Sequence, residues 1–282
     1  MASLAIEPTL VTELPSDTAE LELLPRQYKW EYLPRAGSDT LLVVFSPRPS
    51  FVLRSYDFGY ARVDLVDLGS AYFTGQSGGA CQRLAAFVRQ HGFSRVLFLG
   101  SSKGAFGALL WAAHSGRFMK GVDVRCLAFS PQTQLYPFNE RLYFPSYKRL
   151  MSKIDEPTTT ARGLKTYGDV KDLIEKQRNV RFTIVYGETD PVDAPEAARV
   201  FGPHIRKYPV PVPFHGSVTA FTLDRGNPGK INALVRKLYS DAKTDADLAS
   251  CLPESPRELA RSFSGMHWVP SLQHIVAETM AS

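Results

Sequence analysis

The chain has 282 residues, of which 44% are hydrophobic, 11% aromatic and 22% charged, with 20 Gly and 20 Pro. This composition excludes disordered, collagen-like and coiled-coil proteins, and the length fits one large α/β domain with attachments. The net charge of +5 is not concentrated in any run of Lys and Arg, so we expect no nucleic-acid partner.

The cysteines and the apolar segments set the expected compartment. Cys81, Cys126 and Cys251 lie far apart, which predicts neither a disulfide framework nor a zinc site, and no metal or other cofactor is expected. Residues 1–15 lack a positive region and the long apolar core of a secretory signal, and the apolar window 96–113 is interrupted by serines, a lysine and glycines. We therefore expect a cytoplasmic protein without a membrane span.

The first 37 residues read as a tail followed by one or two irregular strands, for example 20–24 and 28–32, which we expect to form an antiparallel edge. Short apolar runs then alternate with amphipathic stretches. Buried runs separated by helices predict a doubly wound, mostly parallel sheet of the α/β class. The expected strands are 41–45, 62–68, 96–99, 124–129, 182–186 and 205–210, and the expected helices are 79–91, 105–115, 194–201 and 229–239.

Domain boundaries follow from where this alternation stops. It pauses at about 130–179, a segment rich in Pro, Tyr, Phe and Arg, and a loop of that length without structure is improbable in a compact domain. We therefore expect a core over 38–240 with a folded insertion or lid at about 130–179. Residues 241–282 read as a C-terminal extension that ends in a weak amphipathic helix at 272–280. The sequence does not indicate an oligomeric state.

The sharpest motif is a serine between two glycines at the end of an apolar strand. Gly100-Ser101-Ser102-Lys103-Gly104 follows Val-Leu-Phe-Leu, and an Ala/Leu-rich helix begins at once. A nucleophile elbow requires this arrangement, because the serine sits in a strained turn where only glycine lets the neighbouring backbone approach. Ser102 is therefore predicted to be a catalytic nucleophile.

A second G-x-S-x-G occurs at 75–79, also before a helix. Its serine, Ser77, follows Ala-Tyr-Phe-Thr, several residues after the preceding strand has ended. We interpret this second motif as a glycine turn that caps the next helix, and we favour Ser102 over Ser77 as the reactive serine.

A nucleophilic serine needs a histidine base and a carboxylate that orients it. Asp190 and His215 each follow a separate predicted strand, so the order is Ser102, Asp190, His215. Each has an ordinary alternative, since Asp190 before a proline could cap a turn and His215 could be a loop histidine. Asp193 is a second possible acid, although we interpret it as the N-cap of the helix from 194, and His267 is a rival base.

With this order, residues 40–240 resemble an α/β-hydrolase, through 41–46, the elbow, Gly187-Glu-Thr-Asp190 and His215-Gly. The resemblance implies a nucleophile at Ser102, a general base at His215, a carboxylate at Asp190 and an oxyanion hole that uses the backbone N–H of Lys103. Many members have His-Gly in the loop after the first core strand, whereas this chain has Ser46-Pro47-Arg48-Pro49. Because proline has no N–H, Arg48 or Ser46 must supply the second donor.

A fainter resemblance concerns 127–134, which is similar to hydrolase-like proteins of bacterial polysaccharide biosynthesis. It favours a sugar ester as substrate, or acyl transfer to a glycan. We expect the partner to be a small-molecule or glycan ester. Tyr136, Phe138 and Tyr143 of the insertion could line an acyl or sugar pocket or simply pack the insertion onto the sheet. Lys103 and Arg48 could receive an anionic group of the substrate or be solvated.

Three hypotheses for the function follow from these residues. The first is a serine esterase or acyl hydrolase that forms an acyl-enzyme through a Ser-His-Asp triad. The second is an acyltransferase that uses the same triad and passes the acyl group to a sugar or polysaccharide. The third is a hydrolase-like binding protein without activity, which the proline-rich oxyanion loop favours.

Overall fold

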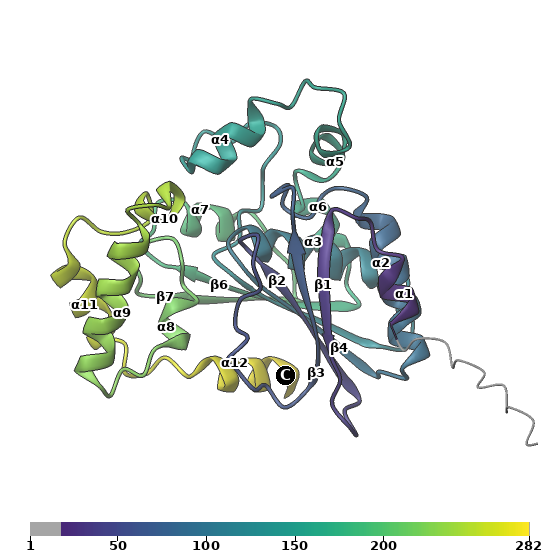
Figure 1. Cartoon of the computed structure of the whole chain (residues 1–282), viewed down its shortest axis with the longest axis horizontal. Coiled ribbons are helices and arrows are strands. Elements are labelled where there is room, and N and C mark those ends of the chain that lie inside the picture. Colours follow the sequence, from purple (N-terminus) through teal and green to yellow (C-terminus); the bar gives the residue numbers. More distant parts are fainter. Residues whose placement is uncertain (1–17, 282) are drawn as a thin grey trace, which may run out of the picture.

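The computed structural model describes residues 18–281, so the prediction for residues 1–15 lies outside it. A seven-stranded sheet forms the centre of the molecule, with the strand order β1-β3-β2-β4-β5-β6-β7 (Figure 1). β1 pairs antiparallel with β3, and every other neighbouring pair is parallel. The strands are β1 (Tyr28–Leu33), β2 (Thr40–Ser46), β3 (Ala61–Asp67), β4 (Arg95–Ser101), β5 (Asp123–Phe129), β6 (Val180–Gly187) and β7 (Ile205–Val210).

The predicted fold class is confirmed, because the six apolar runs form β2 to β7 and the earlier segment forms the antiparallel edge strand β1. β2 is buried along its whole length, with Val43 on one face of the sheet and Val44 on the other. Side chains alternate between the two faces of a strand, so a continuous apolar run requires a cover on both sides.

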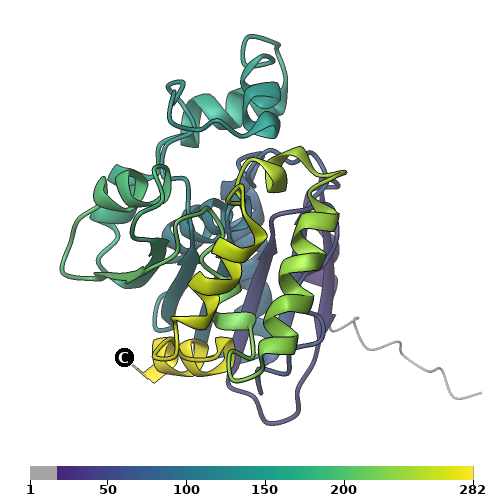
Figure 2. The same cartoon turned by 90° about the vertical axis from the view of Figure 1, so that its left-hand side faces the viewer.

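Helices supply these two covers (Figures 1 and 2). One hydrophobic core joins Val43 and its face to helices α1, α2 and α3, and a second joins Val44 and its face to α8, α9, α11 and α12. The helices are α1 (Ala19–Glu22), α2 (Ser77–Gln90), α3 (Lys103–Ser115), α4 (Pro145–Met151), α5 (Thr159–Tyr167), α6 (Lys171–Lys176), α7 (Asp193–Ala198), α8 (Thr219–Thr222), α9 (Pro228–Asp241), α10 (Ala246–Ala249), α11 (Pro256–Ser264) and α12 (Leu272–Ala281).

The strand predicted at 20–24 is wrong, because this segment forms the short helix α1. Leu21 and Leu24, three residues apart, are buried, whereas Leu23 is 56% exposed. A separation of three places the two buried leucines on one side of a helix, and a strand would have buried Leu21 together with Leu23.

The segment between β5 and β6 contains α4, α5 and α6. Figure 1 shows α4 and α5 above the sheet, on the side where the parallel strands end. The long segment is therefore folded and lies over the end of the sheet at which an open α/β fold gathers its functional loops. Between residues 18 and 281, no helix is both long and apolar enough to cross a bilayer.

Candidate active site

Ser102 lies in the turn between β4 and α3, with φ 51° and ψ −122°. This is a backbone conformation that residues other than glycine rarely adopt. The two flanking glycines are required by close packing, since a Cβ on Gly100 would lie 2.2 Å from the carbonyl oxygen of Gly104, and one on Gly104 would lie 2.1 Å from that of Phe45. The predicted nucleophile elbow is therefore present as a steric feature.

The elbow is fixed to the neighbouring strand and is followed directly by a helix. The backbone N–H of Ser102 donates to the carbonyl oxygen of Phe129 at the end of β5, over 2.9 Å. α3 begins at Lys103, and the N–H groups of a first helical turn have no partner within the helix. The positive end of the helix therefore lies beside Ser102 and favours negative charge there.

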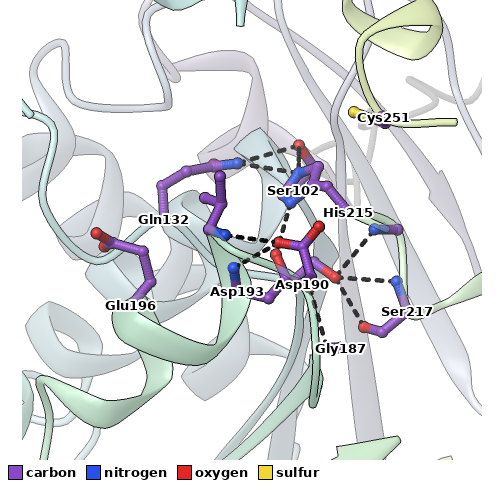
Figure 3. Close-up of polar contacts among 12 residues, drawn as sticks. Ser102, Gln132, Gly187, Asp190, Asp193, Glu196, His215, Ser217 and Cys251 are labelled. Carbon is purple, nitrogen blue, oxygen red and sulfur yellow. Dashed lines mark hydrogen bonds and ion pairs between the residues drawn. The ribbon is translucent and has the colours of Figure 1, made fainter. Parts of the chain in front are cut away.

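His215 reaches Ser102 from the loop between β7 and α8. Its Nε2 lies 2.7 Å from the Ser102 Oγ, and its Nδ1 lies 2.7 Å from Oδ1 of Asp193. His215 is 7% exposed, and its ring packs against that of Phe144 with 4.6 Å between centroids. Serine, imidazole and carboxylate thus form one hydrogen-bonded chain (Figure 3).

The carboxylate in this chain belongs to Asp193, where the sequence predicted Asp190. Asp190 Oδ1 accepts the backbone N–H groups of Val192 and Asp193, at 2.9 and 2.7 Å, so this carboxylate closes the turn that starts α7. Asp193, the first residue of α7, accepts the Gly187 N–H at Oδ2 over 3.1 Å and faces His215 with Oδ1. The two aspartates have exchanged the roles that the sequence suggested for them.

Asp190 also bears on the electrostatics of the site. Burial, and then the nearby charge of Asp193, raise the pKa of Asp190 above its usual value. Ligand atoms of Asp190, Asp193 and His215 lie within 4.8 Å of one another, a spacing that a cation could use. The Nδ1 of His215, both oxygens of Asp193 and one oxygen of Asp190 are already engaged in hydrogen bonds, so the donor set fits a triad better than a metal site.

The loop that carries His215 is fixed by two serines. Ser130 Oγ accepts the N–H groups of Gly216 and Ser217, at 3.2 and 2.9 Å, and donates to Ser217 Oγ. Ser217 Oγ in turn donates to the carbonyl oxygen of Val185 on β6. These buried contacts tie the loop to the ends of β5 and β6, which limits how far the imidazole can move.

Gln132 is a site residue that the sequence analysis did not single out. Its Nε2 lies 3.0 Å from His215 Nε2 and 3.4 Å from Ser102 Oγ, and its Oε1 is buried without a partner among the described residues (Figure 3). Beside it, the Glu196 carboxylate accepts the Thr133 N–H at 2.6 Å and the Asn139 amide at 2.7 Å. The sequence feature that could have identified Gln132 is its position shortly after strand β5. Ser102 and His215 also follow strands, β4 and β7.

Two cavities adjoin Ser102 and His215. The larger, of about 560 Å³, is lined by Ser102, Lys103, His215, Tyr72 and Phe144 among others. The smaller, of about 270 Å³, has mostly apolar walls and is lined by His215, Gly100 and Ser101 among others. The two share the lining residues Pro47, Arg48, His215, Gly216 and Leu248.

The predicted oxyanion residues lie in the elbow and at or just after the end of β2. The two cationic side chains among them form ion pairs with aspartates. Lys103 Nζ lies 3.0 Å from Asp247, and Arg48 lies 3.1 Å from Asp245. Both acids belong to the C-terminal extension, which these ion pairs fix to the elbow and to the loop after β2. Ser46 Oγ accepts the Val52 N–H over 3.3 Å.

The aromatic residues predicted to bind substrate do not line either cavity. Phe138 is 52% exposed and stacks on Tyr147, and Tyr143 packs against Phe144. Tyr136 is partly buried against the core. These three side chains therefore pack the insertion, and its contribution to the larger cavity is Phe144.

The two alternatives to the triad lie elsewhere. Ser77 is fully buried at the start of α2, and its hydroxyl has no hydrogen-bond partner among the described residues. His267 lines neither of the two cavities at the elbow. The imidazole that contacts Ser102 is that of His215.

No protein-family model matches the chain, and comparison with curated proteins finds no match. Solved structures with a similar fold include three with identities of 18% or less. These are the Glycosylation Associate Protein (Gap123) complex from Streptococcus agalactiae (18% identity, TM-score 0.48, 64% of this chain and 39% of that chain), a lipase-esterase related protein from Clostridium acetobutylicum (9%, 0.42, 65% and 90%) and a carboxylesterase from Nitrososphaera gargenis (11%, 0.44, 65% and 85%).

The match to the streptococcal structure thus spans 39% of that chain's length. At such low identities the likeness concerns the fold alone. The strand order, the parallel sheet covered on both faces and the serine turn after β4 are features of this chain itself. They give it the α/β-hydrolase fold.

Proposed function

We propose that this protein is a serine hydrolase that cleaves an ester through an acyl-enzyme. The observation that carries the proposal is the hydrogen-bonded chain from Ser102 through His215 to Asp193, with both contacts at 2.7 Å. Hydroxyl, imidazole and buried carboxylate in this order activate a serine that is otherwise a weak nucleophile.

In the first half of the reaction, Ser102 Oγ attacks the ester carbonyl carbon while its proton passes to Nε2 of His215. The imidazolium is stabilised by Asp193, and the negative oxygen of the tetrahedral intermediate is stabilised by the Lys103 N–H at the start of α3. Collapse breaks the ester C–O bond, the leaving alcohol takes the proton from His215, and the acyl group stays on Ser102.

In the second half, His215 removes a proton from water, which attacks the acyl carbon. Collapse releases the carboxylic acid, and Oγ regains its proton from Nε2. The amide of Gln132, 3.4 Å from Oγ and 3.0 Å from Nε2, is a donor beside both reacting groups. We assign it the role of stabilising charge on the serine oxygen, which adds to the helix N-terminus.

The larger cavity has room for the alcohol part of the ester, and the same room would admit an acceptor alcohol, so acyl transfer is the second candidate function. Tyr72 is 1% exposed and lines this cavity, and its buried hydroxyl lies beside the hydroxyl of Ser146. Such a hydroxyl can bind a hydroxylated alcohol, which leaves as the product of hydrolysis or attacks as the acceptor in transfer.

The test of the proposal is labelling with a serine-directed fluorophosphonate, followed by mapping of the modified peptide. We expect label on Ser102 in the wild-type protein, no label in Ser102→Ala and unchanged label in Ser77→Ala. Label that persists in Ser102→Ala and disappears in Ser77→Ala would overturn the assignment. If no serine is labelled in the folded protein, the chain acts as a hydrolase-like scaffold without activity.

Hydrolysis and transfer are separated by their products. The acyl-enzyme from an activated ester is divided between water and a sugar alcohol present in the same reaction, and both products are quantified. We expect the free acid to dominate. An acylated sugar as the main product would replace hydrolysis by transfer without changing the roles of Ser102, His215 and Asp193.

A further inference from the structure

The smaller of the two cavities lies beside the triad and the elbow but does not contain Ser102 in its lining. It is lined by the backbone before the nucleophile, at Gly100 and Ser101, and by His215 and Gly216. It shares Pro47, Arg48 and Leu248 with the larger cavity that contains Ser102. A molecule whose carbonyl carbon lies at Ser102 can therefore extend into both spaces.

The walls of the smaller cavity are built from apolar side chains of five different parts of the chain. They come from the ends of the central strands, the loop after β2, the segment before α8, helix α9 and the C-terminal extension: Val44, Leu99, Val52, Phe214, Leu238 and Leu252. Val44 and Leu99 are each 1% exposed, and Phe214 is 4% exposed. Such a surface favours an apolar occupant and disfavours a sugar or a charged group.

Several polar side chains in this wall already have partners. Thr219 Oγ1 donates to the carbonyl oxygen of Gly216, and Thr222 Oγ1 donates to that of Thr219 over 3.2 Å. The Arg48 guanidinium is paired with Asp245 at 3.1 Å. A hydroxylated ligand would therefore meet mainly apolar side chains there, whereas the larger cavity is lined by the polar residues Ser102, Lys103 and Asp247. The two cavities therefore differ in chemistry.

We propose that the smaller cavity binds the acyl chain of the substrate, and that this chain is an alkyl group of about six to nine carbons. The inference rests on the proposed function. The length follows from the volume of about 270 Å³, which holds on the order of nine groups at roughly 30 Å³ for each water-sized group. An acetyl group would leave most of the cavity empty, and a long lipid chain would exceed it.

The C-terminal extension acquires a role in this proposal. Leu248 on α10 and Leu252 just after it complete the apolar wall, while Asp245 and Asp247 fix the same segment to Arg48 and Lys103. The extension thus closes one side of the acyl site and sets its depth.

The experiment measures kcat/KM for p-nitrophenyl esters of two, four, eight and sixteen carbons. Burial of each methylene is worth about fourfold while the chain still enters the cavity, so we expect octanoate to exceed acetate by at least about tenfold and palmitate to fall again. Leu252→Trp fills the cavity and should move the optimum to butyrate, whereas Leu252→Ala should move it to longer chains.

Leu234→Trp is the matched control, because Leu234 is half-buried against the same core but does not line the smaller cavity. It should leave the chain-length profile unchanged. An optimum at acetate in the wild-type protein overturns the acyl-site proposal, even if Leu252→Trp does not fold. Failure of the proposed function looks different: no ester of any length would then be hydrolysed faster by the wild-type protein than by Ser102→Ala.

Discussion

The chain contains the same five-residue pattern twice, and the structure uses the two copies in different ways. At Gly100–Gly104 the central serine lies in a strained turn, and its oxygen meets an imidazole. At Gly75–Gly79 the central serine is already inside helix α2 and fully buried. The motif alone therefore does not make a nucleophile.

The difference lies in what the glycines contact. In the elbow, a Cβ on Gly100 or Gly104 would lie within 2.2 Å of a backbone oxygen. In the other copy, a Cβ on Gly75 would lie 2.2 Å from the end of the Gln27 side chain, which can move, and neither Gly78 nor Gly79 has an atom closer than 3.9 Å. The elbow glycines are required because strand, turn and helix meet there, whereas Gly78 and Gly79 begin an ordinary helix.

The largest expected effect is the difference in kcat between variants of the two serines. Ser102→Ala should lower kcat for an activated ester by about 10⁵- to 10⁶-fold, because loss of the nucleophile disables the whole triad. Ser77→Ala should stay within about threefold, since its hydroxyl touches no reacting group. Steady-state kinetics with both variants measures this. Equal losses in the two would mean that the buried Ser77 affects the elbow through packing.

The next effect tests which aspartate serves His215. Asp193→Asn should lower kcat by about 10⁴-fold, because the amide cannot stabilise the imidazolium as a carboxylate does. The matched control is Asp190→Asn, which retains an oxygen that can accept the N–H groups of Val192 and Asp193. It should lose less than about tenfold. The reverse ranking would restore the assignment made from the sequence.

These two aspartates show how far the sequence could be interpreted. The strands, the elbow and the partner histidine were predictable, because each rests on a local pattern of apolar runs or on a residue that follows a strand. Asp190 and Asp193 lie three residues apart in one turn, and the direction of each carboxylate depends on which backbone N–H groups it meets. No pattern of residue types contains that information.

The insertion and its neighbours were harder to predict for the same reason. Gln132 and Phe144 reach the site only because the Glu196 carboxylate and the turns before α4 fold that segment back. The short helix α1 was misread because Glu-Leu-Glu-Leu alternates like a strand. The positions of Gln132 and Phe144 and the conformation of α1 depend on contacts between segments that are far apart in the sequence.

A third prediction concerns the stability of the elbow. Gly104→Ala places a Cβ 2.1 Å from the carbonyl oxygen of Phe45, so the strand or the helix must shift. We expect a loss of about 3 kcal/mol in the free energy of unfolding and a fall in Tm of roughly 6 to 12 °C. Calorimetry checks the value. An unchanged Tm would show that this junction can expand.

Gln132 distinguishes the two serines in a further way, since the hydroxyl of Ser77 has no such donor beside it. Gln132→Leu preserves the approximate volume and removes the amide next to Ser102 and His215. Loss of one neutral donor should lower kcat by roughly tenfold with little change in KM. Gln132→Glu, which places an acceptor there, should lower kcat further. If Gln132→Leu raises kcat, the amide restrains the imidazole.

The smallest effect should appear at the other copy of the motif. Gly79 is exposed in the first turn of α2, and a Cβ there meets no atom within 4 Å. Gly79→Ala should therefore stabilise the protein by about 0.5 to 1 kcal/mol, because alanine loses less backbone entropy than glycine when a helix forms. Denaturant unfolding measures this gain, and activity should not change. A loss in place of the gain would mean that this glycine, like those of the elbow, is required by packing.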